Sequence, residues 1–129
     1  MNKKTAQCPC GIDKNYAACC GRYHAGGEVA PTAESLMRSR YTAYTLGRED
    51  YLLATWHRRT RPVSLGLASA IPNKWLGLAV TRSEHTGPDR AVVEFVARYK
   101  VGGRAYRLHE VSRFEREAGQ WFYVDRDDA

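Results

Sequence analysis

The spacing of hydrophobic positions changes once along the chain, from a helical period to strict alternation. Over residues 33–46 the apolar side chains recur at steps of three and four, as on one face of a helix: Leu36, Met37, Tyr41 and Tyr44. Thr32 is a suitable N-cap for this helix, and Gly47 is a suitable residue to end it. A second helix is predicted over 50–57, and a short helical turn around residues 64–70 that stops at Pro72.

From Trp75 onward apolar and polar residues alternate, which predicts strands over 75–83, 90–100, 104–116 and 121–125. The segments HTGPD, VGG and 118–120 lie between these strands and are predicted to be turns. Helices followed by consecutive antiparallel strands are typical of the α+β class, in which helices cover one face of a curved sheet. We therefore expect an α+β domain over residues 32–129.

Composition favours one globular domain with a small appendage, because 129 residues include 43% hydrophobic and 26% charged side chains. No apolar run is long enough to cross a membrane, and the first residues lack the apolar core of a secretory signal. We therefore expect a cytoplasmic protein without a membrane partner.

Net charge is +6, and the excess lies in the first part of the chain. Residues 1–74 carry eleven basic and five acidic side chains, whereas residues 75–129 carry nine of each. This distribution is compatible with nucleic-acid binding through the basic N-terminal half. A solvated basic face is the plainer interpretation, because no block of five like charges occurs.

All four cysteines lie in the first 20 residues, as C-x-C-x8-C-C: Cys8, Cys10, Cys19 and Cys20. Two close pairs of thiolates can surround one tetrahedral ion, and zinc suits an all-thiolate set. So short a segment has no core of its own, and a metal would supply folding free energy on the order of 10 kcal/mol. The alternatives are disulfides, a redox-active pair, and a site in which His24 replaces Cys20 as the fourth ligand.

The stretches CPCG and CCG resemble the SEC-C motif, although Ile12 and Asp13 stand where that motif has Ser and Gly. Further stretches, among them TAESLMRSRYTAY, DYLLATWH, VEFVARY and RLHEVSRF, are similar to the YchJ-like family of small bacterial proteins. The resemblance implies a SEC-C zinc segment over 1–31, followed over 32–129 by a cone-shaped domain like nuclear transport factor 2. It also implies that the zinc knob contacts a partner protein, but it implies no particular reaction.

Strand 104–116 places Glu110 and Ser112 on its more apolar face, which we expect to point toward the helices. An inward carboxylate needs a partner, and Arg38, Arg40 or His57 could supply it. Such a group either forms a pocket in the cone or is an ion pair that locks helix to sheet. The candidate pocket residues are Arg38, Tyr44, Trp56, His57, Glu110 and Ser112.

No phosphate loop, G-x-S-x-G elbow or H-E-x-x-H helix occurs in the sequence. We therefore assign no catalytic residue, and we expect a binding or adaptor module rather than an enzyme. A small-molecule or enzymatic pocket in the cone is the alternative. The outer sheet face carries charged residues, but domains of this class often pair, so a homodimer is a further expectation.

Overall fold

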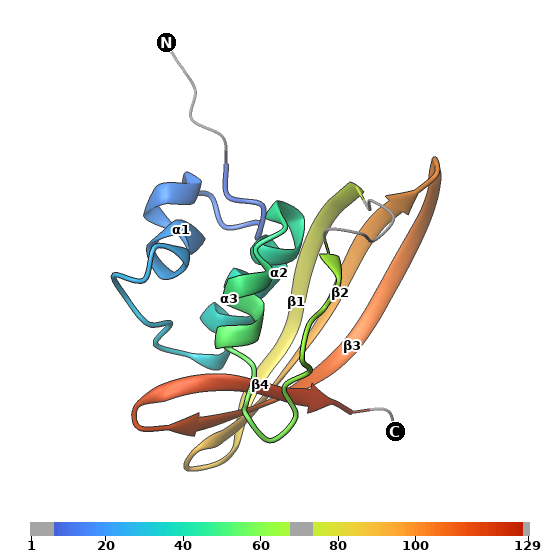
Figure 1. Cartoon of the computed structure of the whole chain (residues 1–129). Coiled ribbons are helices and arrows are strands. Elements are labelled where there is room, and N and C mark those ends of the chain that lie inside the picture. The colour runs from blue at the N-terminus through green and yellow to red at the C-terminus, as the bar shows by residue number, and fades with distance from the viewer. Residues whose placement is uncertain (1–6, 68–73, 128–129) are drawn as a thin grey trace.

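The structure is a computed structural model that describes residues 7–67 and 74–127. Its first part contains the 3₁₀-helix η1 (Tyr16–Ala18) and the α-helices α1 (Cys20–His24), α2 (Ala33–Leu46) and α3 (Glu49–Ala54). Its second part contains the strands β1 (Lys74–Gly87), β2 (Arg90–Val101), β3 (Arg104–Glu117) and β4 (Gln120–Arg126). The strands form one antiparallel sheet in the order β1-β2-β3-β4, and the helices lie on one side of it (Figure 1). The predicted α+β class is confirmed.

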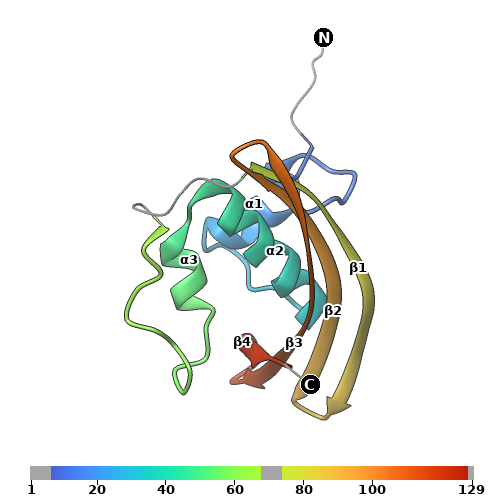
Figure 2. The same cartoon turned by 90° about the vertical axis from the view of Figure 1, so that its right-hand side faces the viewer.

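The sheet bends around α2, as Figure 2 shows. Register shifts mark this curvature along β1, between Trp75 and Gly77, between Val80 and Arg82 and between His85 and Gly87. A further shift lies in β4, between Tyr123 and Asp125, which pair with the consecutive residues Phe114 and Arg113 of β3. Bulges of this kind bend a strand and increase its twist. The concave face therefore encloses the apolar side of α2, and the main core forms between them.

Helix α2 has the predicted bounds because both of its ends are capped locally. Thr32 Oγ1 accepts the backbone N–H of Ser35 at 3.0 Å, and the N–H of Thr32 donates to Ser35 Oγ at 3.0 Å. Gly47 ends the helix in the left-handed conformation, with φ of 71°. The helix is buried on two sides, because Met37 and Tyr41 belong to the main core and Thr42 contacts residues 8–24, here called the cysteine segment.

The predicted helix over 50–57 is too long at its C-terminal end, because α3 ends at Ala54. The next residues pair with β4 instead: the N–H of Tyr123 donates to Thr55 O at 2.9 Å, and the N–H of His57 donates to Tyr123 O at 2.7 Å. This pairing covers the edge of β4, which would otherwise be open.

The first strand is longer than predicted, because β1 runs to Gly87 and only Pro88 and Asp89 form the turn expected over HTGPD. Residues 64–66 form no helix, and the rest of the predicted turn, from 68 to Pro72, lies outside the described residues. Within the part that the structure describes, no helix is long and apolar enough to span a bilayer.

Strand β3 presents the predicted faces. Ser112 and Phe114 are buried, and Glu110 is half-buried on the same side. On the other face His109 is exposed, and its Nε2 lies 2.6 Å from a carboxylate oxygen of Glu94.

Candidate metal centre

Four cysteines converge beside α2: Cys8, Cys10, Cys19 and Cys20. Cys8 and Cys10 lie on the first arm of the cysteine segment, and Cys19 and Cys20 lie on the second arm, at the start of α1. Their Sγ atoms all lie within 4.8 Å of one another, and those of Cys10 and Cys19 are 3.6 Å apart. The side chains are 0–4% exposed, and all four are free thiols. The disulfide alternative is therefore not what the structure shows, and the donor set has the size and chemistry of a closed metal site.

The first arm is a tight loop that turns two sulfurs toward the same point. The N–H of Cys8 donates to Lys14 O at 2.8 Å, and the N–H of Gly11 donates to Cys8 O at 3.2 Å. Gly11 has φ of 96°, a conformation that favours glycine. Asn15 then caps η1 by accepting the N–H of Ala18 at 3.0 Å, which starts the turn into the second arm.

A glycine is required directly after Cys19 and Cys20, at position 21. A Cβ at this position would lie 2.7 Å from the carbonyl oxygen of Tyr16 and 3.0 Å from its ring. The start of α1 therefore packs directly on the backbone of η1, and this contact places Cys19 and Cys20 beside the first arm.

The thiols influence one another strongly. The Cys20 thiol hydrogen-bonds to Cys10 and holds the pKa of Cys10 below its usual value, whereas burial raises the pKa of Cys19. The bond to Cys10 in turn raises the pKa of Cys20. Four negative charges so close together are favourable only around a cation, so the cluster suits a metal ion better than it suits bare thiolates.

The cluster is fastened to α2 by two side chains. Thr42 Oγ1 donates to Cys20 Sγ at 3.4 Å and lies 3.8 Å from Cys8 Sγ. Arg38 Nη1 donates to the carbonyl oxygen of Cys10 at 2.8 Å, and Arg38 Nε pairs with Glu34 at 3.0 Å. Arg38, predicted to line the pocket, instead holds the loop that carries the first two cysteines.

His24 does not replace Cys20 in the cluster. Its Nε2 lies 2.8 Å from the carbonyl oxygen of Ser39, which can only accept, so Nε2 carries the proton. Its Nδ1 then accepts the hydroxyl of Tyr16 at 2.6 Å. Both ring nitrogens are engaged, and His24 packs the cysteine segment against α2.

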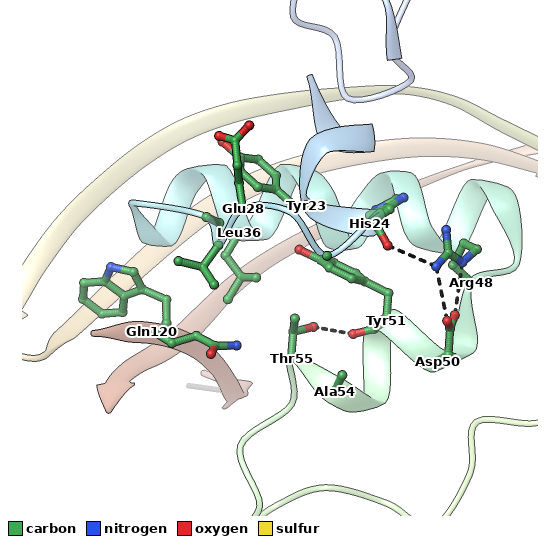
Figure 3. A pocket seen from close by; sticks show the side chains of 14 residues that line it. Tyr23, His24, Glu28, Leu36, Arg48, Asp50, Tyr51, Ala54, Thr55 and Gln120 are labelled. Carbon is green, nitrogen blue, oxygen red and sulfur yellow. Dashed lines mark hydrogen bonds and ion pairs between the residues drawn. The ribbon is translucent and has the colours of Figure 1, made fainter. Parts of the chain in front are cut away.

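A cleft of about 280 Å³ lies where the cysteine segment meets the rest of the molecule. Figure 3 shows Arg48 beside it, between the carbonyl oxygen of His24 and the carboxylate of Asp50. Gln120, from the opposite side, and Val29 also line the cleft. Sequence reasoning missed this site, because its walls come from α1, α3 and β4.

A second cavity, of about 330 Å³, lies between α2 and the concave sheet and contains three of the candidate pocket residues: Tyr44, Glu110 and Ser112. Arg40 also lines it. The other candidates lie elsewhere. Trp56 packs edge-on against Tyr123, and His57 Nε2 lies 2.8 Å from a carboxylate oxygen of Glu117. The structure therefore does not pair Glu110 with His57.

His57, Glu115 and Glu117 form a second group of potential metal donors. His57 Nδ1 accepts the backbone N–H of Arg59 at 3.0 Å, so Nε2 carries the ring proton and donates to Glu117. Arg58 and Arg59 pair with the two carboxylates. This group is an ion-pair network that ties the segment after α3 to the sheet, and its donors do not suit a metal.

Comparison with known proteins agrees with this architecture, a cysteine segment packed on a helix-covered sheet. Residues 32–126 match the family model described as "YchJ, middle NTF2-like domain". The chain is 60% identical over 124 residues to a UPF0225 protein of Chromobacterium violaceum, covering 92% of this chain and 90% of the relative. It is 56% identical over 126 residues to one of Cupriavidus pinatubonensis, covering 93% and 87%.

Two solved structures have the same fold over nearly the whole chain. A SEC-C motif containing protein from Rhodopseudomonas palustris has a TM-score of 0.86 and 34% identity, with 96% of this chain and 99% of that chain covered. One from Psychrobacter arcticus has a TM-score of 0.80 and 29% identity, with 92% and 80% covered. The class defined by fold and site is thus an NTF2-like domain preceded by a SEC-C-type cysteine segment. The chain belongs to the YchJ-like family.

Proposed function

We propose that the protein is a zinc-dependent docking module, in which one zinc ion shapes a surface that contacts a partner protein. The observation that carries this proposal is the buried cluster of four thiols fastened to α2. Four sulfurs at about 2.3 Å from one zinc ion lie about 3.8 Å apart. The distance of 3.6 Å between Cys10 and Cys19 and the span of 4.8 Å for the cluster are close to that arrangement.

A structural role fits this cluster better than catalysis. Four protein ligands leave no position for water or substrate, and the sulfurs are buried. When bound, zinc would supply the positive charge that keeps four thiolates together. The residues of the chain do the rest: the loop after Cys8 and the start of α1 orient the sulfurs, while Arg38 and Thr42 join them to α2.

The docking surface would be the outer side of the cysteine segment. Ile12 is 38% exposed on the first loop, and Val29 is 58% exposed beside the cleft of Figure 3. An exposed apolar side chain on a metal-shaped loop, such as that of Ile12, suits a partner that offers an apolar side chain. The description of the Rhodopseudomonas palustris protein as a SEC-C motif containing protein supports the zinc assignment.

The test is capture of a partner by the full chain, followed by direct titration of the purified partner. We expect Cys19→Ser to abolish capture, and Ile12→Glu to weaken it at least tenfold while zinc content is unchanged. Val63→Glu is the matched control, because Val63 is fully exposed (100%) on the loop after α3. If the same partner binds equally well to the wild type, Cys19→Ser and Ile12→Glu, the docking proposal is wrong.

Nucleic-acid binding through the basic N-terminal half stays a prediction. Several arginines in this half already pair with carboxylates: Arg22, Arg38, Arg48, Arg58 and Arg59. Binding that weakens steeply as salt rises would support it. A homodimer and a cytoplasmic location also stay predictions.

A further inference from the structure

The cavity between α2 and the concave sheet is lined mainly by aromatic and aliphatic side chains. Its volume is about 330 Å³, within the range of sites that bind small molecules. Six rings line it: Tyr41, Tyr44, Trp75, Phe95, Phe114 and Tyr123. The polar side chains that join them include Arg40 from α2 and Glu110 and Ser112 from β3.

Arg40 is a buried cation with unused donors. Only 5% of the residue is exposed, and its guanidinium lies beside both Trp56 and Tyr123, at 5.1 and 4.6 Å from the centroids of their rings. Nη1 donates to Leu52 O and to Thr55 Oγ1, both at 2.7 Å. Within residues 7–67 and 74–127, Nε and Nη2 donate to no protein group, and no carboxylate oxygen lies within 4.0 Å.

A buried charge that no carboxylate contacts directly is unfavourable, and Glu110 acts on Arg40 only from a distance. Burial lowers the pKa of Arg40 to about 10, so the guanidinium still carries its charge at neutral pH. The fold therefore maintains a desolvated cation on the wall of a cavity, where a bound anion would complete its hydrogen bonds.

Glu110 supplies the opposite charge on the same cavity. One carboxylate oxygen accepts the hydroxyl of Ser112 at 2.6 Å, and no cation pairs with Glu110 among the described residues. The two charges thus lie on one aromatic cavity without touching each other, so the expectation of a locking ion pair between helix and sheet fails here.

We infer that this cavity binds a small aromatic carboxylic acid that also carries an N–H donor. Its carboxylate would pair with Arg40, its ring would pack against the aromatic walls, and its N–H would donate to Glu110. The inference is independent of the zinc site, which lies on the other side of α2.

Three related probes separate these contributions: indole, indole-3-acetate and 1-methylindole-3-acetate. Each is titrated by calorimetry into the metal-loaded full chain, and amide shifts in a nitrogen-15 spectrum locate the site. A charge-assisted contact to a buried cation predicts that indole-3-acetate binds at least tenfold more tightly than indole. Loss of the N–H should weaken binding severalfold, and the shifted amides should belong to β2, β3 and α2.

Arg40→Met should remove the preference for the carboxylate, and Arg107→Met, on the exposed side of β3, should keep it. Glu110→Gln tests the other end without touching the helix contacts of Arg40. It should keep the preference for the carboxylate but reduce the difference between the N–H and N-methyl probes, because the Gln amide oxygen still accepts a hydrogen bond but carries no charge. Equal affinity for indole and indole-3-acetate, shifts outside the cavity, or an unchanged N-methyl difference in Glu110→Gln would each overturn the inference.

Discussion

Arg38 links the cysteine segment to α2, and replacing Arg38 tests whether the segment and the α+β domain fold as one unit. Its Nη1 donates to the carbonyl oxygen of Cys10 at 2.8 Å, and its Nε pairs with Glu34 one helical turn earlier. Arg38→Met keeps the aliphatic part of the side chain but removes both contacts. We expect this variant to be destabilised much more when zinc is bound than when it is absent.

The magnitude follows from the two contacts. A partly buried hydrogen bond from a charged donor contributes about 1.5–3 kcal/mol, and an exposed pair spaced by four residues about 0.3–0.5 kcal/mol. The expected loss with zinc bound is about 2 kcal/mol, or roughly 7 °C in Tm for a chain of 129 residues. Without zinc only the helical pair remains, so the loss is about 0.5 kcal/mol or less. By linkage, the substitution weakens zinc binding about tenfold.

The assay is calorimetric unfolding of wild type and Arg38→Met, each with zinc and after chelation, together with competition against a chelator of known affinity. Glu34→Gln is the control, because it removes the ion pair and leaves the bond to Cys10. Equal losses of stability with and without zinc, or unchanged zinc affinity, would refute the coupling between the loop and α2.

Three further outcomes are expected. Gly21→Ala places a Cβ 2.7 Å from a backbone oxygen, so it should lower the free energy of unfolding by about 1–3 kcal/mol and weaken zinc binding in a titration with a chelator. Gly27→Ala is the control and should be neutral, because open space surrounds that position. Arg59 lowers the pKa of Glu115, so their pair stabilises fully above the usual carboxylate pKa of 4.5 and is lost as pH falls through the lowered value. Arg59→Met should therefore flatten the acid limb of a stability-versus-pH curve, and an unchanged limb would contradict this. His57→Phe should lower the free energy of unfolding in urea by about 1–3 kcal/mol without changing zinc content. A loss of metal would contradict our interpretation of His57, Glu115 and Glu117 as an ion-pair network.

Local signals in the sequence were sufficient to predict the bounds of α2 and the clustering of the four cysteines. Thr32 and Gly47 fix the ends of the helix through bonds to near neighbours, and the spacing of the cysteines brings four sulfurs together within a short loop and one turn of helix. Both features depend on contacts within a few residues, which spacing alone can indicate.

Features that depend on distant parts of the chain were not predictable in this way. Thr55 and His57 continue the helical pattern, but they pair with β4 because Tyr123 offers both a donor and an acceptor. Alternation along β3 correctly predicted that Glu110 faces the helices, yet it could not show that His57 pairs with Glu117 and not with Glu110. A strand pattern assigns a face to each side chain but not the partner across the gap.

The positions of the arginines along α2 are informative in the sequence itself. Arg40 lies four residues from both Leu36 and Tyr44, so it shares the sheet-facing side of α2, whereas Arg38 lies about 200° around the helix from it. Helical position alone thus separates the arginine of the cavity from the arginine of the metal loop.

The most direct test of the central claim is the native mass of the chain purified without added metal. We predict one zinc ion per chain, with four free thiols recovered after chelation, and no zinc on Cys19→Ser. A metal-free mass short by two or four hydrogens would show disulfides in place of the zinc site and would contradict the account.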